Sequence, residues 1–479
     1  MSDTRTAIDR FFAISARGST FSREIRGGLA TFFTMAYIVV LNPLIIANGK
    51  DVTGQYIGDG STPPLALVAA GTAFVAGVMT ILMGVIGKVP FAMAAGLGLN
   101  AFVTFNIATV MTWEEAMGLV FLEGIIIAVL VLTGLRTAVF HAIPAQLKTA
   151  ISVGIGLFIA LIGFVDAGFV RRAEGTPLQM GIAGQLTSWP ILVFVVGLLA
   201  TAAMVVRRVK GGILIGIVGT TILAIIVEAI VRAGGFTPEN PGGWQLNRPT
   251  VPERIFGFDN PLTLFTEFDP FGGFVRVGVL LAGLLVFTLL ITDFFDTMGT
   301  IVGVGRQADL VQADGTLPRT REILLVDSIG AAAGGAGSVS SNTTYIESAA
   351  GVGEGARTGL ASVVTGLLFL VAIFFTPLVE VVPYEAAAPA LVLVGFLMMT
   401  AVRDIDWNDY EIAIPAFLTI VIMPFTYSIS NGIGAGFITY VLIKVVRGKA
   451  RQVHPLLWAV AILFVLYFAI GPIRTLFGV

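Results

Sequence analysis

The chain has 479 residues, of which 56% are hydrophobic and 12% are charged, with a net charge of −2. Soluble domains carry about 25% charged residues, so this composition excludes an ordinary soluble domain and indicates an all-α polytopic membrane protein. No Cys is present, which excludes disulfides, iron–sulfur clusters and thiolate metal sites. The only histidines, His141 and His454, lie at the edges of apolar segments, so neither a metal centre nor a cofactor is expected. The charge balance gives no indication of nucleic-acid binding, and the expected surroundings are membrane lipid.

Apolar segments recur along the chain, and about fourteen of them predict membrane crossings. Their expected bounds are 28–47, 67–87, 90–107, 115–133, 141–165, 189–206, 212–232, 277–303, 322–338, 339–352, 358–378, 385–402, 411–429 and 433–447. A further stretch, 456–472, could span the membrane, continue the last helix after a break, or lie in the interface. Residues 1–27 are polar and charged without a signal-peptide apolar core, so the first membrane helix is expected to direct insertion.

Basic residues gather in alternate loops, which predicts the orientation. With the N-terminus inside, the inner loops receive bases such as Arg23, Lys88 and Arg306, whereas outer loops receive acids such as Glu115. The longest loop, roughly 233–276, then lies outside. We expect a multi-pass protein of the plasma (inner) membrane with a cytoplasmic N-terminus.

The two halves of the chain show weak internal similarity in the same order. The matched stretches are 30–41 with 292–304, 138–164 with 379–402 (Pro144 matching Pro383), and 212–229 with 432–448. An odd number of segments in each half requires the second half to have the opposite topology. The pattern therefore predicts two inverted repeats of seven segments, 1–250 and 251–479, which is the usual architecture of secondary transporters.

The third segment of each half is a poor continuous helix. Residues 91–105 contain Gly96, Gly98 and Asn100, and residues 331–351 contain several glycines followed by a run of Ser, Val, Asn and Thr. Such residues favour extended backbone, which is tolerated at membrane depth only where it is buried in protein or lines a cavity. Interrupted segments at corresponding positions of two halves predict the binding site of a transporter.

Three carboxylates lie inside apolar stretches without a neighbouring Lys or Arg. Asp293 and Asp296 are one helical turn apart in LLITDFFDTMGTIVGVG, and Glu347 follows the Ser/Thr/Asn run of SNTTYIESAAG. A carboxylate inside a bilayer is costly, so it marks a substrate or ion pathway. At the start of a half-helix, the free N–H groups and the helix dipole favour the ionised form of Glu347.

Structural roles are the alternatives for these acids. Asp293 and Asp296 could be hydrogen-bonded to neighbouring helices, and Glu347 could be a capping-box residue. Against this, Asn100 lies in the other broken segment, at what we expect to be the mirror position of Glu347, and an amide facing a carboxylate suits a planar heterocycle with donors and acceptors. Two further intramembrane acids, Glu123 and Asp327, are interpreted as structural.

Four motifs of the chain resemble those of the AzgA-like purine permeases, within the nucleobase–ascorbate and nucleobase–cation symporter assemblage. They are GLATFFTMAYIVVLNP (28–43), AAGLGLNAFVTF (94–105), FFDTMGT (294–300) and TTYIESAAGVGEGARTGLAS (343–362). The resemblance runs nearly the whole length and implies the uracil-carrier-like fold, with fourteen segments in two inverted repeats and short strands in the third and tenth. It also implies a core domain (28–133 and 277–378) that moves against a gate domain (141–232 and 385–472), and a homodimer.

Carried over residue by residue, the resemblance places substrate-binding groups at Asn100, Ala101, Asp296, Thr344, Ile346 and Glu347, with Ala101 and Ile346 acting through their backbones. Asp296, with Asp293, would couple transport to protons. Related uracil carriers have a histidine where this chain has Thr300, which leaves the proton relay open. Candidates for stacking on the base are Phe33, Phe102 and Phe295.

The expected function is proton-coupled uptake of a purine nucleobase (hypoxanthine, guanine or adenine), without enzymatic activity. The residues do not rank these bases, nor exclude uracil, xanthine or Na⁺ coupling. A rival on the same fold is an exchanger of an inorganic anion such as sulfate. Uncompensated carboxylates oppose that rival, because an anion site should present Lys, Arg or helix N-termini. An intramembrane enzyme would need a nucleophile–base pair or metal ligands at depth, and no Cys or mid-segment His is present.

Overall fold

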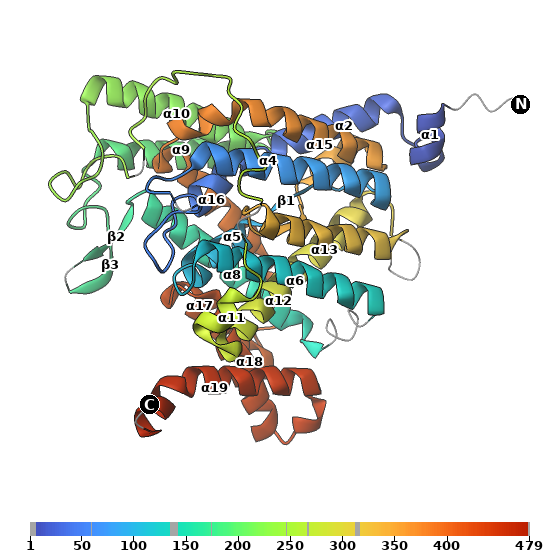
Figure 1. Ribbon diagram of the computed structural model, residues 1–479, viewed down its shortest axis with the longest axis vertical. Coiled ribbons are helices and arrows are strands. Elements are labelled where there is room, and N and C mark those ends of the chain that lie inside the picture. Colours follow the sequence, from blue (N-terminus) through green and yellow to red (C-terminus); the bar gives the residue numbers. More distant parts are fainter. Residues whose placement is uncertain are drawn as a thin grey trace, which may run out of the picture.

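The computed structural model describes residues 6–58, 60–134, 142–173, 175–245, 247–265, 268–311 and 317–477. Its long apolar helices run side by side in one bundle (Figure 1). The short helix α1 (Ala7–Phe12) lies at one end of this bundle, and the hairpin of β2 (Val170–Ala173) and β3 (Thr176–Met180) lies at the opposite end (Figure 1). The expected start of the fifth segment at His141 lies outside the described residues.

The elements follow the expected segments closely. In the first half they are α2 (Phe21–Met35), α3 (Ile38–Ile46), α4 (Leu65–Leu82) with a π-helical turn (Met83–Gly87), β1 (Met93–Ala95), α5 (Leu97–Phe102) with a second π-helical turn (Val103–Ile107), α6 (Trp113–Thr133), α8 (Ala145–Asp166), α9 (Trp189–Val206) and α10 (Gly212–Val231). In the second half they are α11 (Gly272–Val277), α12 (Val279–Gln307), α13 (Thr320–Ala336), β4 (Asn342–Thr344), α14 (Ser348–Gly353), α15 (Gly359–Ala372) with a 3₁₀ extension (Ile373–Val381), α16 (Tyr384–Met399), α17 (Tyr410–Phe425), α18 (Ile429–Val446) and α19 (Pro455–Phe477), with 3₁₀ turns at Ser15–Arg17, Thr400–Asp404 and Ala450–Gln452.

Ten helices of the described part are long and apolar enough to cross a membrane. The chain is therefore a polytopic helical membrane protein, as its composition predicts. The four other expected segments correspond to shorter elements, namely β1 with α5, α13, β4 with α14, and α17. Helix α19 covers the ambiguous stretch 456–472 as one continuous helix after a break, and it packs along α18.

Two groups of helices show the most extensive packing. The first group contains α2, α3, α4, α6, α13 and α15. In it α6 packs against α13, α15 packs against α2 and α4, and α4 also packs against α3 and α13. The other joins α16 with α8, α9 and α10, and α17 with α8 and α18. Glycines allow the closest of these contacts, since a Cβ atom on Gly124 of α6 would collide with the backbone N of Ala332 in α13.

The broken third and tenth segments are confirmed. Strands β1 and β4 form an antiparallel pair in which Ala94 lies opposite Thr343, and all six strand residues are buried. Two further backbone hydrogen bonds extend the pair, from Gly96 N to Ser341 O at 3.0 Å and from Tyr345 N to Ala92 O at 2.9 Å. On the outer edges of the pair, Met93 bonds through its N–H and C=O to the hydroxyl of Thr80, and Thr344 N donates to Asp327. These backbone groups are thus bonded within the protein, which is the condition for extended chain at membrane depth.

The two matched prolines occupy equivalent places. Pro144 is the N-cap residue of α8 and Pro383 is the N-cap residue of α16, and these two helices pack against each other. Proline lacks a backbone donor, so it fits the start of a helix where the N–H would have no partner. At this position, the two matched stretches have the same local structure.

Candidate functional site

The pairing of β1 with β4 places the starts of two short helices next to the long helix α12. Helix α5 follows β1 after Gly96, and α14 follows β4 after Tyr345 and Ile346. The hydroxyl of Ser348, the first residue of α14, accepts a hydrogen bond from Ala92 N at 2.9 Å. The polar groups predicted from the two broken segments are therefore concentrated in one small part of the fold.

Glu347 is the N-cap residue of α14, and its side chain is partly buried. One carboxylate oxygen, Oε1, accepts a hydrogen bond from the hydroxyl of Tyr37 at 2.5 Å. Tyr37 is 1% exposed and lies at the break between α2 and α3. A charge-assisted hydrogen bond of this kind orients the carboxylate and leaves its second oxygen, Oε2, for another partner.

Sequence reasoning did not single out Tyr37 as a functional residue. The available signal was a phenol in the middle of an apolar segment, because a buried Tyr hydroxyl normally finds a hydrogen-bond partner. The identity of that partner could not be read from the chain, since Tyr37 and Glu347 are 310 positions apart.

Asp296 lies near the middle of α12, and its side chain is exposed. Gly303 is two helical turns further along the same face, and a Cβ atom there would lie 3.7 Å from the side chain of Ile346. This face of α12 is therefore turned toward the start of α14, and the charges of Asp296 and Glu347 interact. The structure brings Asp296, Ile346 and Glu347 together, and the side chain of Ile346 is 51% exposed.

Asn100 is fully buried in α5, and neither its amide oxygen nor its amide nitrogen has a hydrogen-bond partner. It is not a strict counterpart of Glu347, because it lies five positions after the end of β1 whereas Glu347 lies three positions after the end of β4. The position equivalent to Glu347 is Gly98, which faces Ile155 of α8. The backbone ladder of α5 begins with Asn100 N donating to Gly96 O at 2.8 Å, one residue before Ala101.

Two other predicted residues belong to a buried polar network. Thr344 donates to Asp327 Oδ1 through its backbone N–H at 3.1 Å and its hydroxyl at 2.9 Å. Asp293 is 1% exposed and accepts a hydrogen bond from the hydroxyl of Ser341 at 3.3 Å. Thr344 and Asp293 are thus separated from the exposed carboxylate of Asp296, although Asp293 is only one turn away on the same helix.

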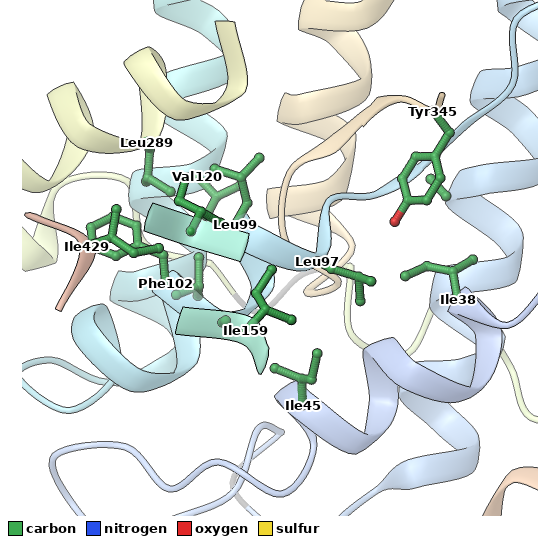
Figure 2. Packing of buried hydrophobic residues seen from close by; sticks show 14 of the residues in the cluster. Ile38, Ile45, Leu97, Leu99, Phe102, Val120, Ile159, Leu289, Tyr345 and Ile429 are labelled. Atoms are coloured by element: carbon green, nitrogen blue, oxygen red, sulfur yellow. The ribbon is translucent and has the colours of Figure 1, made fainter. Parts of the chain in front are cut away.

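The three stacking candidates differ in their surroundings. Phe33 of α2 is 51% exposed, and its ring packs edge-on against that of Phe32. Phe102 is fully buried among Val120, Leu289 and Ile429, as Figure 2 shows, and stacking on a ligand would require it to leave this cluster. The side chain of Phe295 lies outside the described part of the structure.

Among the described residues, no group of three or more His, Cys, Asp and Glu side chains is arranged to hold a metal ion. The arrangement around Glu347 instead combines two accessible carboxylates, one oriented by the phenol of Tyr37, with the apolar side chain of Ile346. Such a site can accept hydrogen bonds from a planar, neutral molecule that offers N–H donors.

Comparison with known proteins identifies the family. A family profile described as "Permease family" matches residues 22–435. The chain belongs to this family. The permease is 38% identical over 464 residues to the guanine/hypoxanthine permease PbuG of Bacillus subtilis, which covers 96% of the chain and 98% of that protein. It is 35% identical over 462 residues to the adenine permease AdeP of Escherichia coli, covering 96% and 95% of the two chains. It is thus a membrane transporter and not an enzyme.

Solved structures agree on the fold. The transmembrane domain of the cyanobacterial bicarbonate transporter BicA matches with a TM-score of 0.56 at 14% identity, covering 87% of this permease and 97% of that chain. The murine anion transporter Slc26a9, in an inward-facing state, matches with a TM-score of 0.58 at 11% identity, covering 93% and 74%. At such low identity these likenesses show the architecture alone.

Proposed function

We propose that this permease imports purine nucleobases together with protons. The observation that carries the proposal is the pairing of Glu347, oriented by Tyr37, with the exposed carboxylate of Asp296. A purine base presents ring N–H donors along one edge, and a carboxylate with a free oxygen accepts from such donors. The full-length likeness to guanine/hypoxanthine and adenine permeases supports this substrate class.

Within the proposed site, Glu347 recognises the base and Asp296 completes the hydrogen-bonding edge. The exposed side chain of Ile346 and the exposed ring of Phe33 supply apolar contact with the flat faces of the base. The unpartnered amide of Asn100 is a further ligand, because a buried amide without a hydrogen bond is costly and gains from a substrate or water partner. The backbones of Ala101 and Ile346, together with Thr344, complete the proposed set.

Transport follows from movement of one group of helices against the other. We assign residues 28–133 and 277–378 to a core domain that carries Asp296 and Glu347, and residues 141–232 and 385–472 to a gate domain. Fourteen crossings in two inverted repeats are supported by the antiparallel pairing of β1 with β4 and by the equivalent prolines at α8 and α16. The proposed orientation has the N-terminus in the cytoplasm, with the permease in the plasma membrane. We further propose that it assembles as a homodimer.

Proton coupling is proposed because the core domain holds carboxyls at membrane depth. Asp296 and Asp293 lie one turn apart in α12, the first accessible and the second buried. Moving an ionised carboxylate through the bilayer centre is costly, so a core domain that binds a proton crosses more readily than one that does not. The proton gradient across the membrane then drives accumulation of the base.

An anion substrate fits the site less well, although two solved structures of the same fold are anion transporters by title. An anion next to Asp296 and Glu347 would meet two negative charges, and like charges at short range repel. Lys210 pairs with Glu354 at the C-terminal end of α14, whereas Glu347 lies at the start of that helix.

A competition panel tests the substrate class. Cells expressing the permease take up radiolabelled hypoxanthine in the presence of a hundredfold excess of unlabelled adenine, guanine, hypoxanthine, xanthine, uracil or sulfate. The proposal expects strong inhibition by at least one purine other than hypoxanthine and none by sulfate. Inhibition by sulfate alone, or no uptake of any purine, would contradict it.

A further inference from the structure

A second group of acids lies buried in the same half of the bundle. Glu123 of α6, Asp293 of α12 and Asp327 of α13 are 0%, 1% and 2% exposed. Helices α6 and α13 approach closely at Gly124, which brings Glu123 toward α13 and α12. Three carboxyls thus meet in the packed interior, where sequence reasoning had interpreted Glu123 and Asp327 as structural.

The hydrogen-bond donors are divided unequally among the three carboxyls. Asp327 accepts from the backbone N–H and the hydroxyl of Thr344, and from the hydroxyl of Thr297 at 2.8 Å. The Thr297 hydroxyl lies farther from Asp293, at 3.4 Å. Since hydrogen bonds to the charged form stabilise it, Asp327 is equipped to remain ionised.

Glu123 and Asp293 have far fewer donors. Their carboxyl groups face each other, and the hydroxyl of Ser341 lies beside both while donating to Asp293 Oδ2. Among the described residues, no group donates a hydrogen bond to either carboxylate oxygen of Glu123. One hydroxyl proton cannot satisfy two carboxylates, and two facing carboxylates can be hydrogen-bonded to each other only if one of them carries a proton.

The ionisable groups around this pair are acids. Asp327 acts on Glu123 from α13, and both Asp327 and Asp296 act on Asp293. Strands β1 and β4 and helices α4 and α5 carry no ionisable side chain. The cations on these helices and their neighbours lie elsewhere or have partners. Arg276 of α11 pairs with Glu115, Lys444 of α18 pairs with Glu411, and Arg321 of α13 donates to Leu132 O. Arg306 lies in the last turn of α12, more than three turns from Asp293. Helix α8 carries Lys148 in its first turn and Asp166 at its end.

We propose that Glu123 and Asp293 together form the binding site of the transported proton, and that Asp327 beside them stays ionised and anchors strand β4. The inference rests on the proton coupling proposed above and moves the proton from Asp296 to the buried pair. In this scheme a proton enters past the exposed Asp296, is held between Glu123 and Asp293 while the core domain crosses, and leaves by the same route on the other side.

The buried pair is linked to the base-binding residues by two elements. Along α12, Asp293 is one turn from Asp296, and their charges interact. Along β4, Asp327 holds Thr344, which lies three residues before Glu347. Loss of the proton adds a negative charge next to Asp296 and next to the anchor of β4, so proton binding and base binding favour each other.

The test uses the full-length permease in proteoliposomes without Na⁺, as wild type, Glu123→Gln and Glu385→Gln. Glu385 is the matched control, because it is also a fully buried glutamate, and it accepts a hydrogen bond from Gln245 N that a glutamine can also accept. Measurements are equilibrium binding of hypoxanthine between pH 5.5 and 8.5, counterflow exchange, and accumulation driven by an inward proton gradient.

We expect Glu123→Gln to retain hypoxanthine binding and counterflow exchange, but its binding should no longer depend on pH. Its accumulation of hypoxanthine in a proton gradient should fall at least about tenfold. Glu385→Gln should behave as wild type. If the Glu123→Gln variant showed the same pH dependence and the same accumulation as the wild type, the buried-pair proposal would be wrong, while proton-coupled transport could still hold. A wild-type protein that accumulates base only with Na⁺ would instead overturn the proton coupling on which it rests.

Should Glu123→Gln fail to fold, Ser341→Ala provides the second variant. It removes the hydroxyl that donates to Asp293 Oδ2 and thereby disfavours the doubly ionised state, so the pH midpoint of hypoxanthine binding should rise by about half to one unit. An unchanged midpoint would overturn the proposal as well.

Discussion

Two groups of carboxyls in this permease have the same chemistry but opposite surroundings. Asp296 and Glu347 are accessible or partly so, and Glu347 receives a hydrogen bond from a phenol. Glu123, Asp293 and Asp327 are enclosed, and their partners are Ser and Thr hydroxyls and a backbone N–H. The comparison teaches that access and the supply of donors, rather than residue type, distinguish a group that recognises a solute from one that holds a proton.

The largest expected effect comes from Glu347→Gln. It replaces a charged acceptor by an amide that presents a donor to the ring N–H groups of the base, so uptake of radiolabelled hypoxanthine should fall at least about a hundredfold. Size-exclusion chromatography should show a folded protein. Glu354→Gln, at the other end of α14, is the control and should retain most uptake. Uptake by Glu347→Gln at the wild-type level would remove Glu347 from the site.

Tyr37→Phe sharpens the role of orientation in the accessible pair. The variant removes the hydroxyl that donates to Glu347 and leaves the ring in place. A hydrogen bond to a charged group contributes roughly 1.5–3 kcal/mol, so hypoxanthine binding should weaken roughly ten- to a hundredfold. Tyr440→Phe in α18 serves as the control, and equal affinities of both variants would show that the phenol does not position the carboxylate.

Gly124→Ala tests the packing that assembles the enclosed group. An added methyl would collide with the backbone of Ala332, whereas the same change at Gly219 of α10 would meet nothing within 4 Å. Overpacking costs roughly 1–3 kcal/mol, so thermal unfolding in detergent should occur several degrees lower for Gly124→Ala than for Gly219→Ala. Matching transition temperatures would mean that α6 and α13 can separate without cost.

The smallest expected effect is that of Asn100→Ala. Its amide has no protein partner, so the variant should weaken purine binding by about 1–3 kcal/mol and leave stability unchanged. Asn42→Ala is the opposite case, because the Asn42 amide nitrogen donates to Thr72 Oγ1 at 2.8 Å and to Val339 O at 3.1 Å. It should lower the transition temperature and spare binding, and a stability loss in Asn100→Ala would assign that residue a structural role instead.

Much of the architecture was predictable because local composition determines it. Long apolar runs predict helices, and the glycine-rich and hydroxyl-rich interruptions predicted the broken segments that contain β1 and β4. The sequence did not predict which side chains from distant segments lie next to each other. Glu123 had no partner in its own segment, and the packing of α6 against both α12 and α13 places it near Asp293 and Asp327. The sequence also did not show that Asn100 and Glu347 occupy different positions in their two segments. That difference depends on where β1 and β4 end, which the residues alone do not fix.

The most direct test of the account measures proton movement caused by the base itself. Proteoliposomes containing wild-type permease and an internal pH-sensitive dye, in Na⁺-free buffer, receive hypoxanthine from outside. The account predicts internal acidification that saturates at the same hypoxanthine concentration as uptake and is absent in Glu347→Gln. Uptake of hypoxanthine without acidification, or uptake that requires Na⁺, would contradict it.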